Sequence, residues 1–71
     1  MDDKSALTAL KNLLARKQQE VWSCDVRLKT LNEDYAEDPY PDTAAQIERV
    51  AARLTLARID AEALSIAVQK F

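Results

Sequence analysis

The residue types able to do chemistry are sparse in this sequence, and the missing types exclude most catalytic sites. The 71 residues contain no histidine and no glycine. Without histidine, the Ser/His/Asp and Cys/His catalytic arrangements and most zinc sites cannot be assembled. Without glycine, the phosphate-binding loops of P-loop and dinucleotide-binding proteins cannot form. We therefore expect a protein that is not an enzyme and that binds no cofactor and no metal.

Cys24 and Lys17 carry nucleophilic groups, and both fall on an apolar helical stripe that is defined below. A thiol at such a position packs as a small apolar group, because a reactive thiol needs exposure and a lowered pKa. We expect the ammonium group of Lys17 to reach solvent past the small side chain of Ala61, which faces it. The alternative is that this lone charge sets the register of the stripe.

An acid-only segment lies near the middle of the chain. Residues 33–42 contain five carboxylates and no base. The segment lacks the glycine and the ligand spacing of an EF-hand loop, so we expect a solvated turn without calcium. Tyr35 and Tyr40 bracket these acids, and aromatic groups among acids suit a basic, partly apolar partner surface. The alternative is that the two tyrosines pack over the end of the fold.

Trp22 is the second candidate for a partner contact. It follows Val21, a stripe residue, and lies about 130° from the centre of the stripe, with Val26 one turn farther along. Tryptophan is enriched among the residues that dominate binding energy. Incidental exposure and packing inside an oligomer are the alternatives. The predicted partner-binding residues are Trp22, Val26, Glu33, Asp34, Tyr35, Glu37, Asp38 and Tyr40.

Two apolar stripes determine the predicted fold. Both show the alternating three- and four-residue spacing of one face of an α-helix. The first stripe is Leu7, Leu10, Leu14, Lys17, Val21, Cys24, Leu28, Leu31 and Tyr35, and the second is Ile47, Val50, Leu54, Ala57, Ala61, Leu64, Val68 and Phe71. If the chain folds back at Pro39, facing residue numbers sum to 78. The sequence therefore predicts an all-α fold, a two-helix antiparallel coiled-coil hairpin.

Proline and capping residues set the predicted boundaries within a single domain of residues 1–71. Both prolines lie in Asp38-Pro39-Tyr40-Pro41, and the residue before a proline avoids helical geometry. Asp2 or Asp3 is the predicted N-cap of the first helix. Thr43 and Gln46 resemble a capping box for the second, with Asp42 as a competing cap. We predict helices over 3–34 and 43–70 joined by a turn over 35–42.

The second helix carries a further apolar stripe that points away from the first helix. It lies about 200° around the helix from the facing stripe. A helix that is apolar on two opposite sides is normally packed between neighbours, and this chain has no third element to supply one. We therefore predict a two-fold homodimer with a four-helix arrangement. The predicted dimer-interface residues are Ala52, Leu56, Ile59, Ala63 and Ile66.

Charge is segregated along the chain, although the net charge is only −2. Residues 4–29 carry six bases and two acids, and residues 43–71 carry four bases and three acids. Acids interrupt the bases and no nucleic-acid-reading motif is present, so we do not expect nucleic-acid binding. No apolar run approaches the roughly 18 residues of a membrane span, and the acidic start is unlike a secretory signal. We expect a cytoplasmic protein with no membrane contact.

These observations favour a small non-enzymatic regulator that binds another protein as a helical-hairpin homodimer. A stoichiometric inhibitor, an anti-activator or an adaptor would have this character. Small proteins of this size and shape are common among phage and mobile-element accessory factors, which is an analogy of size and shape alone. The alternatives are a purely structural coiled-coil assembly or chaperone-like subunit, and a nucleic-acid-associated helical protein.

Overall fold

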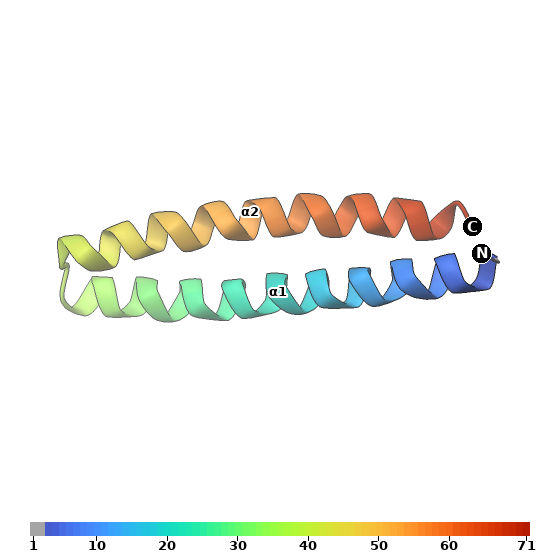
Figure 1. Cartoon of the computed structure of the whole chain (residues 1–71). Coiled ribbons are helices and arrows are strands. Elements are labelled where there is room, and N and C mark those ends of the chain that lie inside the picture. The colour runs from blue at the N-terminus through green and yellow to red at the C-terminus, as the bar shows by residue number, and fades with distance from the viewer. Residues whose placement is uncertain (1–2) are drawn as a thin grey trace.

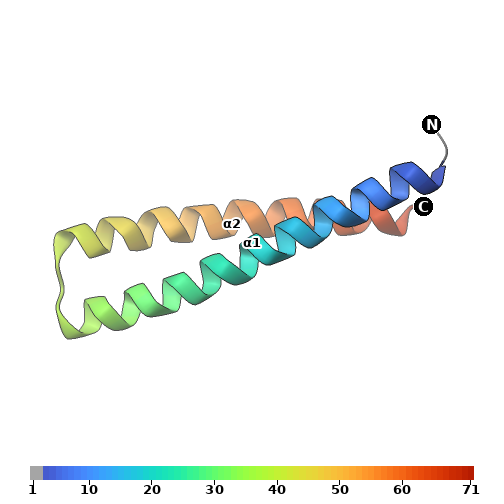
Figure 2. The ribbon, with the colours of Figure 1, turned by 60° about the horizontal axis from the view of Figure 1, so that its bottom comes forward.

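The computed structural model describes residues 3–71, and over that range the chain forms two helices. Helix α1 (Asp3–Glu37) and helix α2 (Pro41–Gln69) lie side by side and run in opposite directions (Figure 1). The Cα atoms extend over 54 × 16 × 13 Å. From another side α1 crosses over α2, so the two helix axes are inclined to each other (Figure 2). The predicted all-α antiparallel hairpin is confirmed.

The core lies along the line where the two helices meet. Cys24, Val50 and Leu54 form a buried cluster. These residues, and those that pack around them, all belong to the two predicted stripes. Val21, Leu28 and Leu31 are half-buried and pack against the cluster, and Ala57 is buried beside it. The facing apolar stripes therefore supply the core, and Cys24 packs within it as predicted.

The connection between the helices is shorter than the predicted turn over 35–42. Helix α1 continues to Glu37 instead of ending at residue 34, and the Asp38 amide still donates to the Asp34 carbonyl at 2.9 Å. Tyr40 is extended, with φ −76° and ψ 140°, because it precedes Pro41. The chain therefore reverses over residues 38–40 alone, and the acids up to Glu37 belong to the last turns of α1.

The predicted capping box is wrong. Helix α2 begins at Pro41 and ends at Gln69, whereas the prediction was 43–70. Thr43 and Gln46 therefore lie inside the helix, and Tyr40, the N-cap residue, makes no side-chain capping hydrogen bond. Proline is favoured at the first helical position because it has no amide hydrogen to cap and its φ is already helical. At the other end Asp3 is the first residue of α1, and Asp2 lies outside the described residues.

The stripes pack less tightly at the ends of the hairpin. Leu7 and Leu10 are half-buried, but Phe71, the predicted partner of Leu7, lies beyond the end of α2 and is 59% exposed. Tyr35 is also exposed. The predicted layer of Leu7 and Phe71 is therefore not a buried one, because α2 ends at Gln69 and Phe71 remains largely exposed. The apolar contact is concentrated nearer the middle of the molecule.

Candidate functional site

Trp22 and Val26 form an exposed apolar pair on α1. The tryptophan is 62% exposed, and Val26 is also exposed. Residues four apart lie on one face of a helix, so the two side chains are neighbours. Neither side chain belongs to the core cluster. The structure thus leaves this predicted contact surface uncovered by the rest of the described chain.

The acid-only segment forms the tip of the hairpin. Its carboxylates have no ion-pair partner within residues 3–71. They are Glu33, Asp34, Glu37, Asp38 and Asp42, and all are exposed. Tyr40 is 61% exposed, so it does not pack over the end of the fold. Three of the acids lie in the last turns of α1, where the helix dipole is negative and disfavours negative charge. The tip therefore carries acids that weaken the helix end.

The tip and the tryptophan pair are separate surfaces. Thirteen residues of one helix separate Trp22 from Tyr35, which corresponds to about 20 Å at 1.5 Å per residue. The structure therefore does not bring the predicted partner-binding residues together at one point. The nearest members of the two surfaces, Val26 and Glu33, are seven residues apart, or about 10 Å, so one partner must span at least that distance to contact both.

The predicted dimer stripe on α2 is exposed along its length. Leu56 is 64% exposed and Ile59 is 57% exposed. The remaining members of the stripe are Ala52, Ala63 and Ile66, which are also exposed. They lie on the side of α2 that faces away from α1. The hairpin alone leaves several large apolar side chains of this helix in solvent.

Ion pairs bridge the two helices on both edges of the core. The three pairs are Lys17 with Asp60 at 3.5 Å, Glu20 with Arg53 at 3.1 Å, and Asp25 with Arg58 at 3.8 Å. Facing residue numbers sum to 78 in the predicted register, and those of Lys17 and Asp60 sum to 77. The numbers of Glu20 and Arg53 sum to 73, and those of Asp25 and Arg58 sum to 83, which is five below and five above the predicted value. Together the three pairs centre on the register in which facing residue numbers sum to 78.

Glu20 holds the most connected of these networks. Its carboxylate accepts hydrogen bonds from Arg53 at 3.1 Å and from Lys17 at 3.2 Å. The hydrogen bond from Arg53 and then the contacts with Lys17 lower the pKa of Glu20. The hydrogen bond to Glu20 and its negative charge, with a smaller contribution from Asp60, raise the pKa of Lys17. Lys17 thus extends from the core line to the edge, where its charge is paired.

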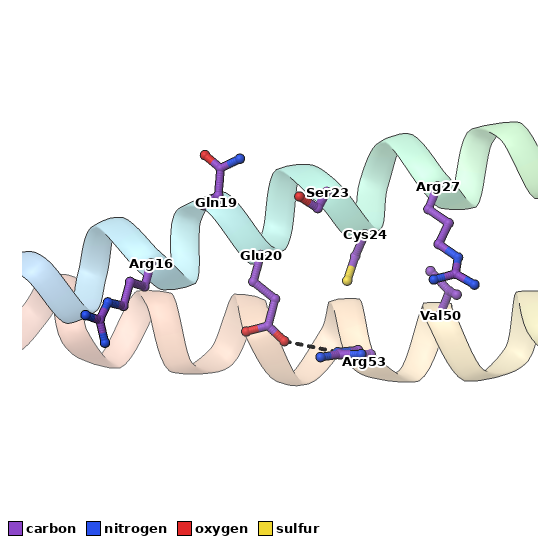
Figure 3. A pocket seen from close by; sticks show the side chains of 8 residues that line it. All are labelled: Arg16, Gln19, Glu20, Ser23, Cys24, Arg27, Val50 and Arg53. Atoms are coloured by element: carbon purple, nitrogen blue, oxygen red, sulfur yellow. Dashed lines mark hydrogen bonds and ion pairs between the residues drawn. The ribbon is translucent and has the colours of Figure 1, made fainter.

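A groove runs along the same edge of the hairpin. Two adjoining hollows of about 390 and 180 Å³ share Arg27, Val50 and Arg53. In Figure 3, Arg16, Glu20 and Arg27 extend from α1 toward α2. The full lining is Arg16, Gln19, Glu20, Ser23, Cys24, Arg27, Gln46, Arg49, Val50 and Arg53. We call this surface the arginine groove. The sequence predictions did not include it.

A sequence signal for the arginine groove exists, but it needs the fold to be interpreted. Arg16, Glu20 and Arg27 are four and seven residues apart, so they share one edge of α1. Arg49 and Arg53 share an edge of α2 for the same reason. Only the antiparallel register shows that the two edges adjoin.

No protein-family model, no curated protein and no solved structure matches this chain. Within residues 3–71, no group of three or more His, Cys, Asp or Glu side chains is placed to hold a metal ion. Neither described helix combines the length and the apolar character needed to cross a membrane.

The Glu20 network predicts a pH dependence of stability. Folding lowers the pKa of Glu20 from its ordinary value of 4.5. The ionised carboxylate therefore stabilises the folded state above that pH, and this stabilisation is lost as the pH falls through the pKa of Glu20 in the folded state. Folding raises the pKa of Lys17 from its ordinary value of 10.5. The charged ammonium group therefore stabilises the folded state below that pH, and this stabilisation is lost as the pH rises through the pKa of Lys17 in the folded state. Urea unfolding of the Glu20→Gln variant should show a smaller loss of stability on acidification than wild type. Glu62→Gln, an exposed acid without an ion pair in the described chain, is the control. Equal acid sensitivity of Glu20→Gln and wild type would contradict this role.

Proposed function

We propose that this chain is a small, non-enzymatic, cytoplasmic regulator that binds another protein and acts as a helical-hairpin homodimer. The observation that carries the proposal is the exposure of large apolar side chains on both helices. Trp22, Leu56 and Ile59 are each more than half exposed. Burying such a side chain contributes about 2 kcal/mol, so the hairpin alone leaves a substantial favourable term unused.

Self-association through α2 is the part of the proposal that concerns the chain itself. In the exposed stripe, the large residues Leu56 and Ile59 lie between the small residues Ala52 and Ala63. Small residues permit two helices to approach closely, and large ones fill the space between them. A two-fold axis near Ile59 would set each stripe against its own copy, as a closed dimer requires.

Partner binding is assigned to the surfaces that this dimer leaves free. Trp22 lies on α1, whereas the dimer stripe lies on the far side of α2. Glu33, Asp34 and Glu37 lie in the last turns of α1, where negative charge destabilises a helix, which supports a role for these acids in binding rather than in folding. An aromatic anchor supplies affinity, and an acidic tip accelerates encounter with a basic partner. An inhibitor, an anti-activator or an adaptor would act in this way.

Charge introduced into the α2 stripe should separate the protomers. Leu56→Glu combined with Ile59→Glu places four carboxylates in the shared interface of a dimer, where an unpaired buried charge is strongly unfavourable. Sedimentation equilibrium should report a dimer for wild type and a monomer for the double variant. Asn12→Asp with Gln18→Glu adds the same charge to exposed positions of α1 and should leave the dimer intact. A wild-type chain that sediments as a folded monomer at micromolar concentration would overturn the dimer.

Truncation of Trp22 and neutralisation of the tip should weaken partner binding in different ways. Crosslinked complexes would be captured with three baits, namely wild type, Trp22→Ala, and a tip variant with Glu33, Asp34, Glu37 and Asp38 changed to amides. With the partner in hand, Trp22→Ala should accelerate dissociation about thirtyfold, or about 2 kcal/mol. The tip variant should slow association and reduce its dependence on salt.

The matched control for this capture is Glu62→Gln, which changes an exposed charge outside both surfaces. It should retain the partner as wild type does. Equal retention by all four baits would show that neither surface binds the partner, and a structural coiled-coil assembly would then account better for the exposed residues.

A further inference from the structure

The two edges of the hairpin differ in how their charges are balanced. On one edge, Asp25 pairs with both Lys29 and Arg58. On the other edge, the arginine groove holds four guanidinium groups and one carboxylate, and that carboxylate is bound to Arg53 and Lys17. Within residues 3–71, Arg16, Arg27 and Arg49 have no ion-pair partner. The arginine groove is therefore a concentrated and uncompensated positive surface.

We propose that the arginine groove binds an acidic amphipathic α-helix of a partner protein. The floor of the groove includes Cys24 and Val50, the central core residues, and arginines line both sides. An apolar side chain fits the floor while carboxylates reach the sides, and arginine pairs with carboxylates in a forked geometry. Such a helix, laid between α1 and α2, would complete a three-helix arrangement.

The spacing of the arginines matches a helix of three to four turns. Arg16 and Arg27 are eleven residues apart on α1, which corresponds to about 16 Å. Arg49 on α2 faces position 29 of α1, two residues beyond Arg27. Its charge therefore lengthens the row of arginines by about half a helical turn. Carboxylates at alternating four- and three-residue spacing on one helix cover the same length. Charge and length therefore agree with one helical ligand.

A nucleic acid fits this surface less well. The acid-only tip begins at Glu33, about one helical turn beyond the position that Arg49 faces. A long polyanion that followed the groove in that direction would meet five unpaired carboxylates. A short helix ends before them. The apolar floor also offers nothing to a phosphate backbone, whereas it suits an amphipathic helix.

This inference extends the proposed function by naming the chemistry of one partner, but it uses a different surface. The groove contains neither Trp22 nor any member of the α2 stripe. Loss of groove binding would therefore leave the dimer and the tryptophan surface unaffected. Conversely, the Leu56→Glu and Ile59→Glu variant should still bind an acidic helix if it remains folded.

The test measures fluorescence anisotropy of a labelled helical peptide of about 14 residues, or four turns, with glutamates at four- and three-residue spacing and leucines on the adjoining stripe. The matched peptide carries glutamine in place of each glutamate. The groove variant combines Arg27→Gln with Arg49→Gln, and Arg58→Gln on the opposite edge is the control for loss of an arginine outside the groove. A labelled DNA duplex of about 20 base pairs tests the nucleic-acid alternative. Circular dichroism checks that each variant retains its helices.

The acidic peptide should bind wild type about tenfold or more tightly than the glutamine peptide, with affinity falling as salt rises. The groove variant should bind it about tenfold more weakly, and Arg58→Gln should stay within about twofold of wild type. Equal binding of the two peptides, or equal loss in the groove variant and in Arg58→Gln, would overturn the proposal. So would duplex binding that depends on Arg27 and Arg49 in the absence of peptide binding.

Discussion

Packing of Cys24, Val50 and Leu54 between two antiparallel helices is the interaction on which the rest of this structure depends. The two apolar stripes meet in one register, because a shift by a whole turn would leave apolar positions of one helix without partners on the other. That register also decides which polar residues adjoin. It brings Glu20 beside Arg53 on one edge and Asp25 beside Arg58 on the other.

A two-helix hairpin is thin, and its surface reflects this. Each helix buries one stripe, and even the buried core residues retain some exposure, such as 5% for Leu54. Helix α2 is apolar on two sides, so five of its sixteen apolar residues remain exposed in the isolated chain. Small domains commonly gain missing stability from oligomerisation or from a partner. The proposed dimer and the proposed partner contacts would both bury apolar side chains that the hairpin alone leaves exposed.

The helices and their facing stripes could be predicted from the sequence because three- and four-residue spacing is a local property of the chain. The turn could not be placed as well. Its prediction treated both prolines as helix breakers, whereas Pro41 begins α2 and makes the Thr43 capping box unnecessary. The acids up to Glu37 consequently belong to a helix end and not to a loop.

The arginine groove was beyond the sequence argument for a different reason. Along the chain, acids such as Glu20, Asp25 and Asp60 interrupt the bases, so the sequence shows no continuous basic run. In the fold, Glu20 forms an ion pair with Arg53, and Asp25 forms one with Arg58. Among the described residues, Arg16 and Arg27 have no ion-pair partner. Pairing across the helices depends on the lengths and angles of individual side chains, and a register alone does not determine these.

A disulfide crosslink tests the register most directly. In a Cys24→Ser background, cysteines at Leu14 and Leu64 should join within one molecule under mild oxidation, because these positions face each other when residue numbers sum to 78. Peptide mapping at low protein concentration would identify the intramolecular product. Efficient crosslinking of Leu14 to Ala57 or to Phe71 instead, a full heptad away, would contradict the register and with it the arginine groove.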